Sequence, residues 1–395
     1  MIRFLTAGES HGKCLTLIVE GVPSGLRLSS GDIDNDLRRR QSGYGRGGRM
    51  KIESDRAEIT SGVRAGETLG SPIAAIINNK DWENWQDVMS VESTIQTEKF
   101  TKPRPGHADL AGGIKYHHKD LRNVLERASA RETASRVAAG AIAKRILEEL
   151  GIYVISFVVS IENTKANSII LWDETTRPIP GEWVMDFQNR LDSSPLRCPD
   201  PEAEKLMIDA IDAAKADGDS LGGTFRILVL NAPPGLGSHI HWDRRLDARI
   251  AYAVMSIPAI KGVEIGAGFQ TATSRGSQVH DEIFYDSESG FYRKSNSAGG
   301  IEGGISNGEV IVIDAAMKPI PTLMKPLNSV DYISKEPFLA AKERSDVCAV
   351  PAAGVVGEAV VAVEIANAVL EKFGGDNISE IKYSFEAYKK YLVNL

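Results

Sequence analysis

Short apolar runs alternate with polar connections along the chain, and their spacing predicts an alternation of strands and helices. Runs rich in β-branched residues and bounded by turn residues predict strands at residues 2–5, 14–19, 52–54, 57–63, 72–77, 153–161, 223–230, 262–269 and 309–314. Apolar residues at helical spacing predict helices directly after Ser29 and Ser30 and at residues 128–150, 202–216, 244–255, 357–372 and 379–392. The pattern is typical of an α/β protein.

One long stretch, residues 278–308, is rich in glycine and serine and has no periodic apolar pattern. We expect a functional loop there, because loops longer than about 12–15 residues without structure of their own are usually functional or disordered. No composition typical of a linker separates two halves of the chain, and no segment repeats with a period of about 20–50 residues. A single interleaved unit is therefore expected rather than separate domains.

Composition adds the class of protein and its expected location. The 395 residues are 42 % hydrophobic and 25 % charged, as in soluble globular proteins. Only a very short apolar run precedes Glu9, so we expect no secretory signal, and Glu364 and Asn367 interrupt an apolar run, residues 359–370, that is too short to span a bilayer. We expect a cytoplasmic protein that does not associate with a membrane. The three cysteines have no paired or metal-type spacing, which predicts buried thiols, no disulfide and no metal site.

The charge is unevenly distributed. The net charge is −7, yet residues 38–51 hold five arginines, one lysine and no acidic residue. This run has three interpretations: a solvated basic surface, a contact with RNA through alternating arginine and glycine, or the capture of a small polyanion by several guanidinium groups. We favour the polyanion, because the run is the only such cluster and Tyr44 is its only aromatic residue. No nucleic-acid partner is expected.

Two histidines lie on turns that glycine makes possible. Residues 6–15 read TAGESHGKCL, where Gly8 and Gly12 allow a tight connection that holds Ser10 and His11 outward. His107 follows a Pro-Gly turn in RPGHADL. Imidazole can both donate and accept a proton near neutral pH, so both histidines are candidates for acid-base chemistry. Each could equally be a solvated histidine on an ordinary turn.

Three further segments carry polar residues in unusual places. RASARETA, residues 127–134, begins the predicted helix 128–150, whose N-terminus favours an anion, so that Arg131 there would face an anionic ligand or pair with Glu126 or Glu132. In KPIPT, residues 318–322, prolines impose an extended backbone while the lysine and threonine offer donors. ERSDV, residues 343–347, could hold a site or only a surface ion pair.

Taken in order, GESHG, RRRQSGYGRGGRMKIESD, RPGHADL, RASARETASRVAAGAIAK, KGVEIGAGF, AGGIEGGISNG, KPIPT and RSDV strongly resemble the chorismate synthase family over nearly the whole chain. The resemblance implies an α/β fold, a β-α-β sandwich in which mixed sheets enclose helices, formed by one domain over residues 1–395. It implies a homotetramer. It also implies a lyase of the shikimate pathway that converts 5-enolpyruvylshikimate 3-phosphate to chorismate and phosphate by 1,4-trans elimination, with reduced FMN although no net redox change occurs.

The resemblance also assigns roles to residues. Substrate anions would be bound by Ser10, Arg40, Arg46, Arg49, Arg131 and Arg344, and NADP by Arg40 and Arg46. The flavin would be bound by Arg127, Ala128, Ser129, Pro258, Ala259, Gly303, Lys318, Pro319, Ile320, Pro321, Thr322 and Arg344. Position 258 departs from several relatives, which carry an amide side chain where proline offers only its carbonyl.

For catalysis the resemblance implies three residues. His11 would act as general acid toward the leaving phosphate, His107 would govern the protonation of the flavin at its N1 side, and Asp346 would assist removal of the proton at N5. The motifs leave open whether NADPH reduces the flavin on this protein or an external flavin reductase supplies it. A flavin-independent phosphate lyase or phosphatase, and an RNA-binding protein, remain the alternative functions.

Overall fold

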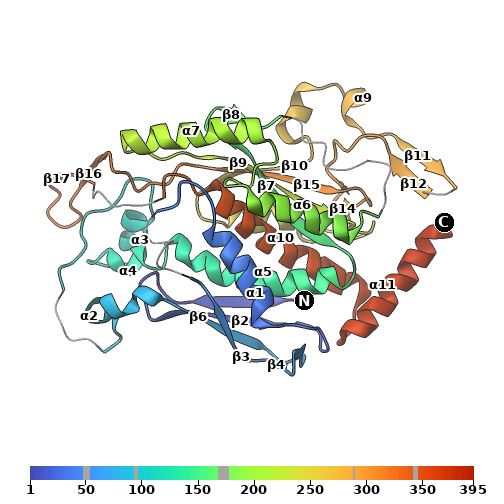
Figure 1. Ribbon diagram of the computed structural model, residues 1–395, viewed down its shortest axis with the longest axis horizontal. Helices are drawn as coiled ribbons and strands as arrows, with labels where there is room; N and C mark the ends of the chain where they lie inside the picture. The colour runs from blue at the N-terminus through green and yellow to red at the C-terminus, as the bar shows by residue number, and fades with distance from the viewer. Residues whose placement is uncertain (48–53, 93–96, 168–177, 288–289, 341–345) are drawn as a thin grey trace.

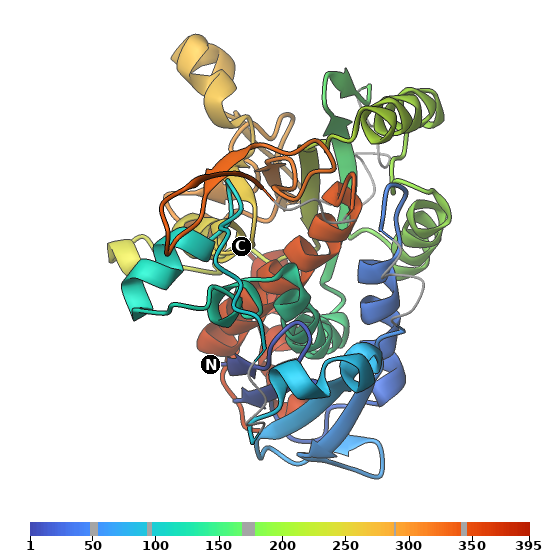
Figure 2. The ribbon, with the colours of Figure 1, turned by 90° about the vertical axis from the view of Figure 1, so that its left-hand side faces the viewer.

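Two antiparallel sheets enclose a layer of helices in the computed structural model of the chain (Figures 1 and 2). The structure describes residues 1–47, 54–92, 97–167, 178–287, 290–340 and 346–395. The α/β class and the sandwich predicted above are confirmed, but the prediction of mixed sheets is wrong, because every strand pair described inside the two sheets is antiparallel. The predicted strand 52–54 lies outside the described residues except for Ser54, which is not in a strand.

The first sheet covers one side of the helices, in the order β1 (Arg3–Ala7), β2 (Cys14–Glu20), β6 (Ile73–Asn78) and β3 (Ala57–Ser61). Along its strands buried and exposed side chains alternate, because every second side chain faces the helices. In β2, for example, Leu15, Leu17 and Val19 are buried, whereas Ile18 is exposed. The turn between β1 and β2 carries the first predicted histidine at the edge of this sheet.

The second sheet has the order β10 (Ile260–Ile265), β15 (Ile311–Met317), β9 (Gly223–Leu230), β7 (Tyr153–Ile161) and β8 (Thr164–Lys165). Both faces of β7 and β9 are covered, so their sequences are almost continuously apolar. The outer face packs on α6 (Gly181–Ser193), a helix that the sequence analysis missed, through Val184, Phe187 and Leu191.

The central layer consists of α1 (Ser30–Gln41), α5 (Thr133–Glu148) and α10 (Val350–Phe373). Small residues let α5 and α10 approach closely: a Cβ on Gly140 would stand 2.3 Å from Cα of Ala359. The helix α10 begins seven residues before the predicted start at residue 357. Gly354 and Gly357 look like helix breakers in the sequence, but a Cβ on Gly357 would stand 2.7 Å from Ile227 of β9, so glycine is needed there for close packing.

The helix α10 is long and apolar enough to cross a membrane by length and composition alone. Of the 18 consecutive residues that are most apolar in this helix, 94 % are buried inside the protein, between the two sheets (Figure 2). Its hydrophobic sequence is therefore accounted for by its position in the core.

The predicted helix 128–150 begins at Thr133 instead of residue 128. A 3-10 turn, η3 (Ala130–Glu132), precedes it, and the hydroxyl of Ser129 accepts a hydrogen bond from the backbone N–H of Arg131. Serine competes in this way with regular helix formation. Arg131 consequently lies on a turn before the helix α5.

The prediction of a long loop at residues 278–308 is wrong in one respect, because this stretch contains two hairpins. Strands β11 (Ile283–Asp286) and β12 (Gly290–Arg293) pair, as do β13 (Ile301–Glu302) and β14 (Ile305–Ser306). Phe284 faces Tyr292 across the first hairpin with ring centroids 5.6 Å apart. Such cross-strand aromatic pairs stabilise a hairpin. The glycine-rich residues around this hairpin make its strands hard to predict from the sequence.

The remaining elements surround the sandwich. They are β4 (Val63–Arg64), β5 (Glu67–Thr68), η2 (Lys80–Asn84), α2 (Gln86–Met89), α3 (Asp109–Tyr116), α4 (Arg122–Leu125), α7 (Pro201–Asp217), η4 (Trp242–Arg244), α8 (Leu246–Met255), η5 (Gly268–Thr273), α9 (Gly276–Val279), β16 (Asn328–Val330), β17 (Pro337–Leu339) and α11 (Ile378–Val393). The predicted helices 202–216, 244–255 and 379–392 correspond closely to α7, α8 and α11. The predicted strands 262–269 and 309–314 correspond to β10 and β15 with shifted ends.

Candidate active site

His11 lies on the turn between β1 and β2 and is held from two sides. Its Nδ1 is 2.9 Å from Oε2 of Glu126, and its backbone N–H donates to the same oxygen over 2.9 Å. Its ring stacks on Trp85 with the centroids 4.0 Å apart and the planes 28° apart. The orientation of the imidazole is thereby fixed, with Nδ1 turned toward the protein.

Glu126 is a buried carboxylate at the end of α4. Burial by itself raises the pKa of Glu126, but the hydrogen bonds and the charge of His11 outweigh it, so the pKa lies below its ordinary value. An ionised carboxylate on Nδ1 favours the histidine tautomer that carries a proton there. Glu126 is therefore a partner that can support proton transfer by His11.

Two predicted anion-binding arginines converge on one carboxylate. Nη1 of Arg131 lies 2.7 and 2.6 Å from the two oxygens of Asp55, and Nη1 of Arg40 lies 3.7 Å from Oδ2. Nε of Arg131 donates to Asn79 over 2.9 Å, while the Asn79 amide nitrogen donates to the carbonyl of Gly12 over 2.6 Å. Asn79 thus joins the arginine pair to the turn that carries His11.

This arginine pair keeps two buried N–H groups for a ligand. Nη1 of Arg40 and Nη2 of Arg131 are buried and have no hydrogen-bond partner within the described ranges. Burial chiefly, together with the nearby charges of Arg131 and Arg46, lowers the pKa of Arg40 to about 10, in spite of Asp55. Buried donors without a partner are costly, and a bound anion would satisfy both.

The arginine run is fastened to the segment around Asp346. Nη1 of Arg46 lies 3.1 Å from Oδ2 of Asp346, and the N–H of Gly47 donates to Oδ1 over 2.6 Å. The carbonyl of Gly45 accepts a hydrogen bond from the N–H of Val347 over 2.7 Å. The structure therefore brings Arg46 and Asp346 together, whereas the predicted residues Arg49 and Arg344 lie outside the described residues.

His107 lies on the turn before α3 and also has a buried carboxylate on Nδ1. Oδ1 of Asp109 is 2.5 Å from that nitrogen, and Nε of Arg104 donates to Oδ2 over 2.9 Å. Burial raises the pKa of Asp109, but the hydrogen bonds of His107 and Arg104 dominate and lower it to about 2. Both candidate histidines therefore share one arrangement, a carboxylate that orients the ring through Nδ1.

The low pKa of Asp109 makes a prediction about stability and pH. Because the pKa falls from 3.8 to about 2 on folding, ionised Asp109 stabilises the protein above pH 4, and this contribution disappears as the pH falls through 2. We expect Asp109→Asn to lower the free energy of unfolding by about 2–3 kcal/mol at pH 7. Urea unfolding of both proteins from pH 7 downward measures the difference.

The control for this prediction is Asp243→Asn, which removes a carboxylate 2.6 Å from the exposed His241. Surface pairs contribute little, so this variant should unfold like the parent protein. Equal stability of the Asp109→Asn variant and the parent at pH 7 would contradict the prediction.

Segment 318–322 contacts the turn that holds His107. Nζ of Lys318 donates to the carbonyl of Gly106 over 2.6 Å, and a Cβ on Gly106 would lie 3.2 Å from Pro321. The N–H of Lys318 donates to the carbonyl of Ala259 over 3.0 Å. Ala259 has φ +71°, a strained conformation of the kind found at functional sites. Three predicted flavin-binding positions are thus grouped beside His107.

Arg127 and Ser129 lie at the first histidine. Nη2 of Arg127 donates to the carbonyl of Thr6 over 2.9 Å, and the hydroxyls of Ser129 and Ser10 are 3.2 Å apart. A series of side-chain hydrogen bonds continues toward Pro258. Thr6 and Arg136 both donate to Glu132, and Arg136 also donates to the hydroxyl of Ser256 over 2.8 Å. The two groups of predicted flavin residues are therefore linked through described contacts.

The other predicted flavin positions are placed as follows. The N–H of Ala128 donates to the carbonyl of Val124, and Pro258 precedes Ala259. Pro319, Ile320 and Thr322 belong to segment 318–322, in which the carbonyl of Ile320 accepts a hydrogen bond from the hydroxyl of Ser220. Gly303 forms the turn between β13 and β14. No contact with the other flavin positions is shown for Gly303 in the described part of the chain.

Sequence reasoning missed the acidic and aromatic partners of the site, Glu126, Asp109, Asp55 and Trp85. Arg131 pairs with Asp55 rather than with Glu126 or Glu132, the alternatives considered from the sequence. Only Asp109 carried a local signal, because it follows His107 by two residues. The others contact the site from distant segments.

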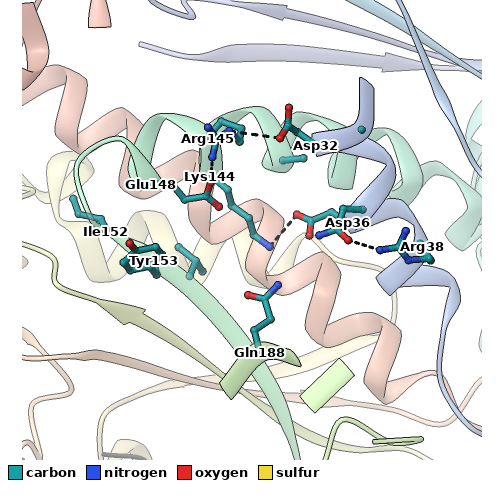
Figure 3. A pocket seen from close by; sticks show the side chains of 13 residues that line it. Asp32, Asp36, Arg38, Lys144, Arg145, Glu148, Ile152, Tyr153 and Gln188 are labelled. Atoms are coloured by element: carbon teal, nitrogen blue, oxygen red, sulfur yellow. Dashed lines mark hydrogen bonds and ion pairs between the residues drawn. The ribbon is translucent and has the colours of Figure 1, made fainter. Parts of the chain in front are cut away.

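A pocket of about 460 Å³ lies away from this site, between α1, α5, α6 and the start of β7 (Figure 3). Lys144, Arg145, Asp32, Asp36 and Glu148 line it with charges of both signs. None of the predicted site residues is among its lining. Its charged groups pair with one another, as Lys144 does with Asp36 over 3.0 Å.

The sequence and the fold were compared with known proteins. The family model described as chorismate synthase matches residues 2–370. Chorismate synthase of Aquifex aeolicus (strain VF5) is 57 % identical over 393 residues, covering 99 % of this chain and 98 % of that protein. The enzyme of Geobacter metallireducens (strain ATCC 53774 / DSM 7210 / GS-15) is 56 % identical over 401 residues, covering 99 % of each.

A solved structure agrees with the sequence comparisons. The protein described as "Crystal Structure of Chorismate Synthase" superposes with a TM-score of 0.79 at 48 % identity, covering 100 % of this chain and 99 % of that chain. Sequence and fold thus agree over nearly the whole length of the chain. The chain belongs to the chorismate synthase family, and it is therefore a lyase of the shikimate pathway.

Proposed function

We propose that this protein converts 5-enolpyruvylshikimate 3-phosphate to chorismate and inorganic phosphate by 1,4-trans elimination in the presence of reduced FMN. The observation that carries the proposal is the buried pair Arg40 and Arg131, in which one nitrogen of each guanidinium group has no hydrogen-bond partner in the described residues. Asn79 joins Arg131 of this pair to the turn of His11. The substrate has one phosphate and two carboxylates. Guanidinium groups bind such anions with charge-assisted hydrogen bonds.

The substrate is bound by Ser10, Arg40, Arg46 and Arg131, together with Arg49 and Arg344. Of the described members, Ser10, Arg40 and Arg131 are buried. The pKa of Arg40 remains at about 10, so its guanidinium is charged at neutral pH. An acidic protein thereby presents a local positive site to a trianion.

His11 donates a proton to the leaving phosphate as the C–O bond breaks. Glu126 holds the ring through its contact with Nδ1. Trp85 restricts the orientation of the His11 ring by stacking on it, with the ring centroids 4.0 Å apart. General acid catalysis of this kind needs an orientation that these two contacts supply.

The residues of the second group suit a flavin. Lys318, Arg127 and Ser129 offer donors for its phosphate and polar ring edge, while Ala259 and Pro321 offer apolar surface and backbone groups. Reduced FMN supplies an electron-rich ring that stabilises the electron-poor substrate carbon. His107, oriented by Asp109 at 2.5 Å, holds a proton at the polar edge of the cofactor. Asp346, once its contact with Arg46 is exchanged, would assist removal of the proton at N5 of the flavin and so take up the hydrogen that the substrate ring loses in the elimination.

Several finer features belong to the same proposal. The protein acts in the cytoplasm as a homotetramer of one-domain chains, residues 1–395. Arg40 and Arg46 bind the phosphates of NADPH where the flavin is reduced on this protein; otherwise an external flavin reductase supplies the reduced cofactor. One hydrophobic cluster includes residues of both sheets and of α1, α5 and α10, which supports a single domain.

An anaerobic assay tests the function. Purified protein, the enolpyruvyl substrate and dithionite-reduced FMN should produce chorismate, detected by its absorbance, together with one equivalent of phosphate. Omission of flavin should abolish both products. Phosphate release without chorismate, or activity in air without a reductant, would favour a phosphatase and contradict the proposal. Replacing dithionite with NADPH shows whether the protein reduces its own flavin.

A further inference from the structure

Asp55 occupies a position that an anionic ligand would be expected to take. Its side chain is fully buried, and both oxygens accept from Nη1 of Arg131 over 2.7 and 2.6 Å. Nη1 of Arg40 approaches it to only 3.7 Å and makes no hydrogen bond in the described residues. The backbone N–H of Asp55 donates to Gln41 over 3.0 Å, which anchors the carboxylate at the end of α1.

The contacts of the two arginines divide into two kinds. Nε of Arg40 donates to Thr133, and Nε of Arg131 donates to Asn79, each over 2.9 Å. These bonds hold the guanidinium groups in place whether or not a ligand is present. Nη2 of Arg40 likewise donates to the carbonyl of Ala130 over 2.9 Å. The remaining outer nitrogens lie near Asp55 or have no hydrogen-bond partner in the described residues, so two positive charges are matched by one negative charge.

We propose that Asp55 is a built-in counter-anion that positions Arg40 and Arg131 and sets the net charge, and hence the anion affinity, of the site that they form. With Asp55 the pair has a net charge of +1, and without it +2. The carboxylate stabilises the ligand-free fold by partly neutralising two buried guanidinium groups. The same carboxylate opposes every anion that enters and thus favours ligands that make many bonds over small anions such as inorganic phosphate.

The proposal rests on the anion site of the proposed function, and its test uses neither flavin nor substrate. The probe is inorganic phosphate, titrated into the full-length protein while the melting temperature is followed. A ligand that binds the folded state raises the melting temperature according to its dissociation constant. We expect Asp55→Asn to melt below the parent protein without phosphate and to bind phosphate more tightly by about tenfold or more, the effect of one charged hydrogen-bonding group.

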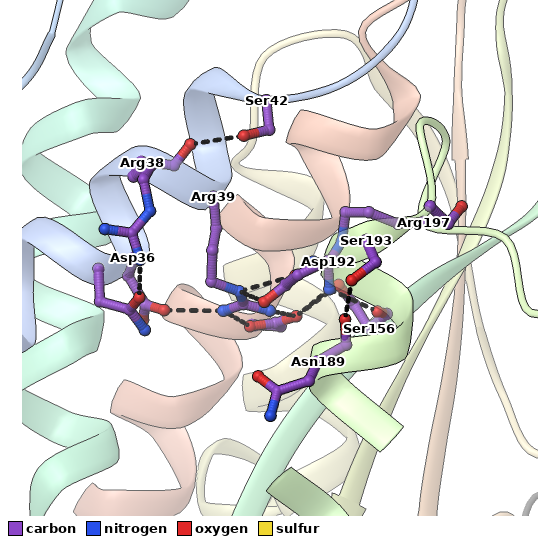
Figure 4. A network of polar contacts seen from close by, with 12 residues as sticks. Asp36, Arg38, Arg39, Ser42, Ser156, Asn189, Asp192, Ser193 and Arg197 are labelled. Atoms are coloured by element: carbon purple, nitrogen blue, oxygen red, sulfur yellow. Dashed lines mark hydrogen bonds and ion pairs between the residues drawn. The ribbon is translucent and has the colours of Figure 1, made fainter. Parts of the chain in front are cut away.

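A matched control is available in a second cluster, shown in Figure 4. Asp192 also lies between two arginines, 3.0 Å from Nε of Arg39 and in contact with Arg197. Asp192→Asn therefore removes a carboxylate of the same kind outside the candidate site. If Asp55→Asn responds to phosphate no more strongly than the parent or Asp192→Asn, the proposal is overturned.

Two further variants decide the question should Asp55→Asn fail to fold. Arg131→Gln leaves Arg40 and Asp55 with no net charge and should lose the response to phosphate. Asp55→Asn combined with Arg131→Gln leaves Arg40 alone, restores a charge of +1 and should regain a response at least as large as that of the parent. Equal responses of these two variants would refute the role of Asp55.

The outcomes separate this inference from the proposed function. Chorismate formation by the parent protein together with an unchanged phosphate response in Asp55→Asn rejects only the counter-anion. The stronger response without chorismate formation by the parent rejects only the proposed reaction.

Discussion

Replacing His11 with alanine is expected to lower turnover to chorismate by about 10- to 10⁴-fold, the range that a positioned general acid contributes. Asn79 joins the turn that carries this imidazole to Arg131 of the arginine pair, and in the proposed reaction the imidazole gives a proton to the leaving phosphate. His11 is not among the predicted flavin-binding residues, so the affinity of the variant for FMN should be largely intact. Stopped-flow measurement of chorismate formation, with flavin binding measured separately, tests both statements. His107→Ala should have an effect in the same range.

The control is His241→Ala, which removes an exposed histidine whose Nδ1 also contacts a carboxylate, that of Asp243 at 2.6 Å. This variant should turn over at the rate of the parent protein. Near-normal turnover of His11→Ala would remove His11 from the mechanism. A loss of flavin binding in His11→Ala would show that the residue supports the cofactor site instead.

Replacing Glu358 with glutamine is expected to lower the free energy of unfolding by about 3–5 kcal/mol, the range for breaking a buried ion pair. Glu358 is fully buried on α10 and lies 2.8 Å from Arg39, 2.5 Å from Lys144 and 3.1 Å from Arg197. Asp36 and Asp192 complete this cluster of three cations and three anions, part of which Figure 4 shows. The substitution leaves one positive charge unmatched in the core.

Denaturant unfolding measures this loss, and two variants interpret it. Lys144→Met in the Glu358→Gln background restores the balance of charge and should recover part of the stability. Asp314→Asn, which breaks the half-buried pair with Arg226 on the second sheet, should cost less than about 1 kcal/mol. A loss in Glu358→Gln no larger than that of Asp314→Asn would contradict a stabilising role of the cluster.

Local sequence patterns predicted most of the regular elements because they depend on neighbouring residues. Ser29 begins α1 with a capping box, in which its N–H donates to Asp32 over 2.7 Å, and this signal is readable from four residues. Asp200 begins α7, and Gly218 ends it in a left-handed conformation. Strands β2 and β6 follow from alternation and from β-branched residues.

Elements whose signals depend on distant packing were missed or displaced. The early start of α10 requires Gly354 and Gly357 to lie against β7 and β9, so the glycines mark a close approach instead of an end. The helix α6 has only a narrow apolar stripe, formed by Val184, Phe187 and Leu191, that finds its partners on the outer face of β7 and β9.

The amino-acid sequence by itself determined the α/β class, the family and the basic and imidazole groups of the candidate site, because these follow from residue types and short motifs. Except for Asp109, which follows His107 by two residues, the tertiary structure alone decided their counter-charges. Arg131 meets Asp55 across 76 positions, His11 meets Glu126 across 115, and Arg39 meets Glu358 across 319. Which acid neutralises which base depends on how the sheets and helices pack, since no local pattern records contacts between segments so far apart.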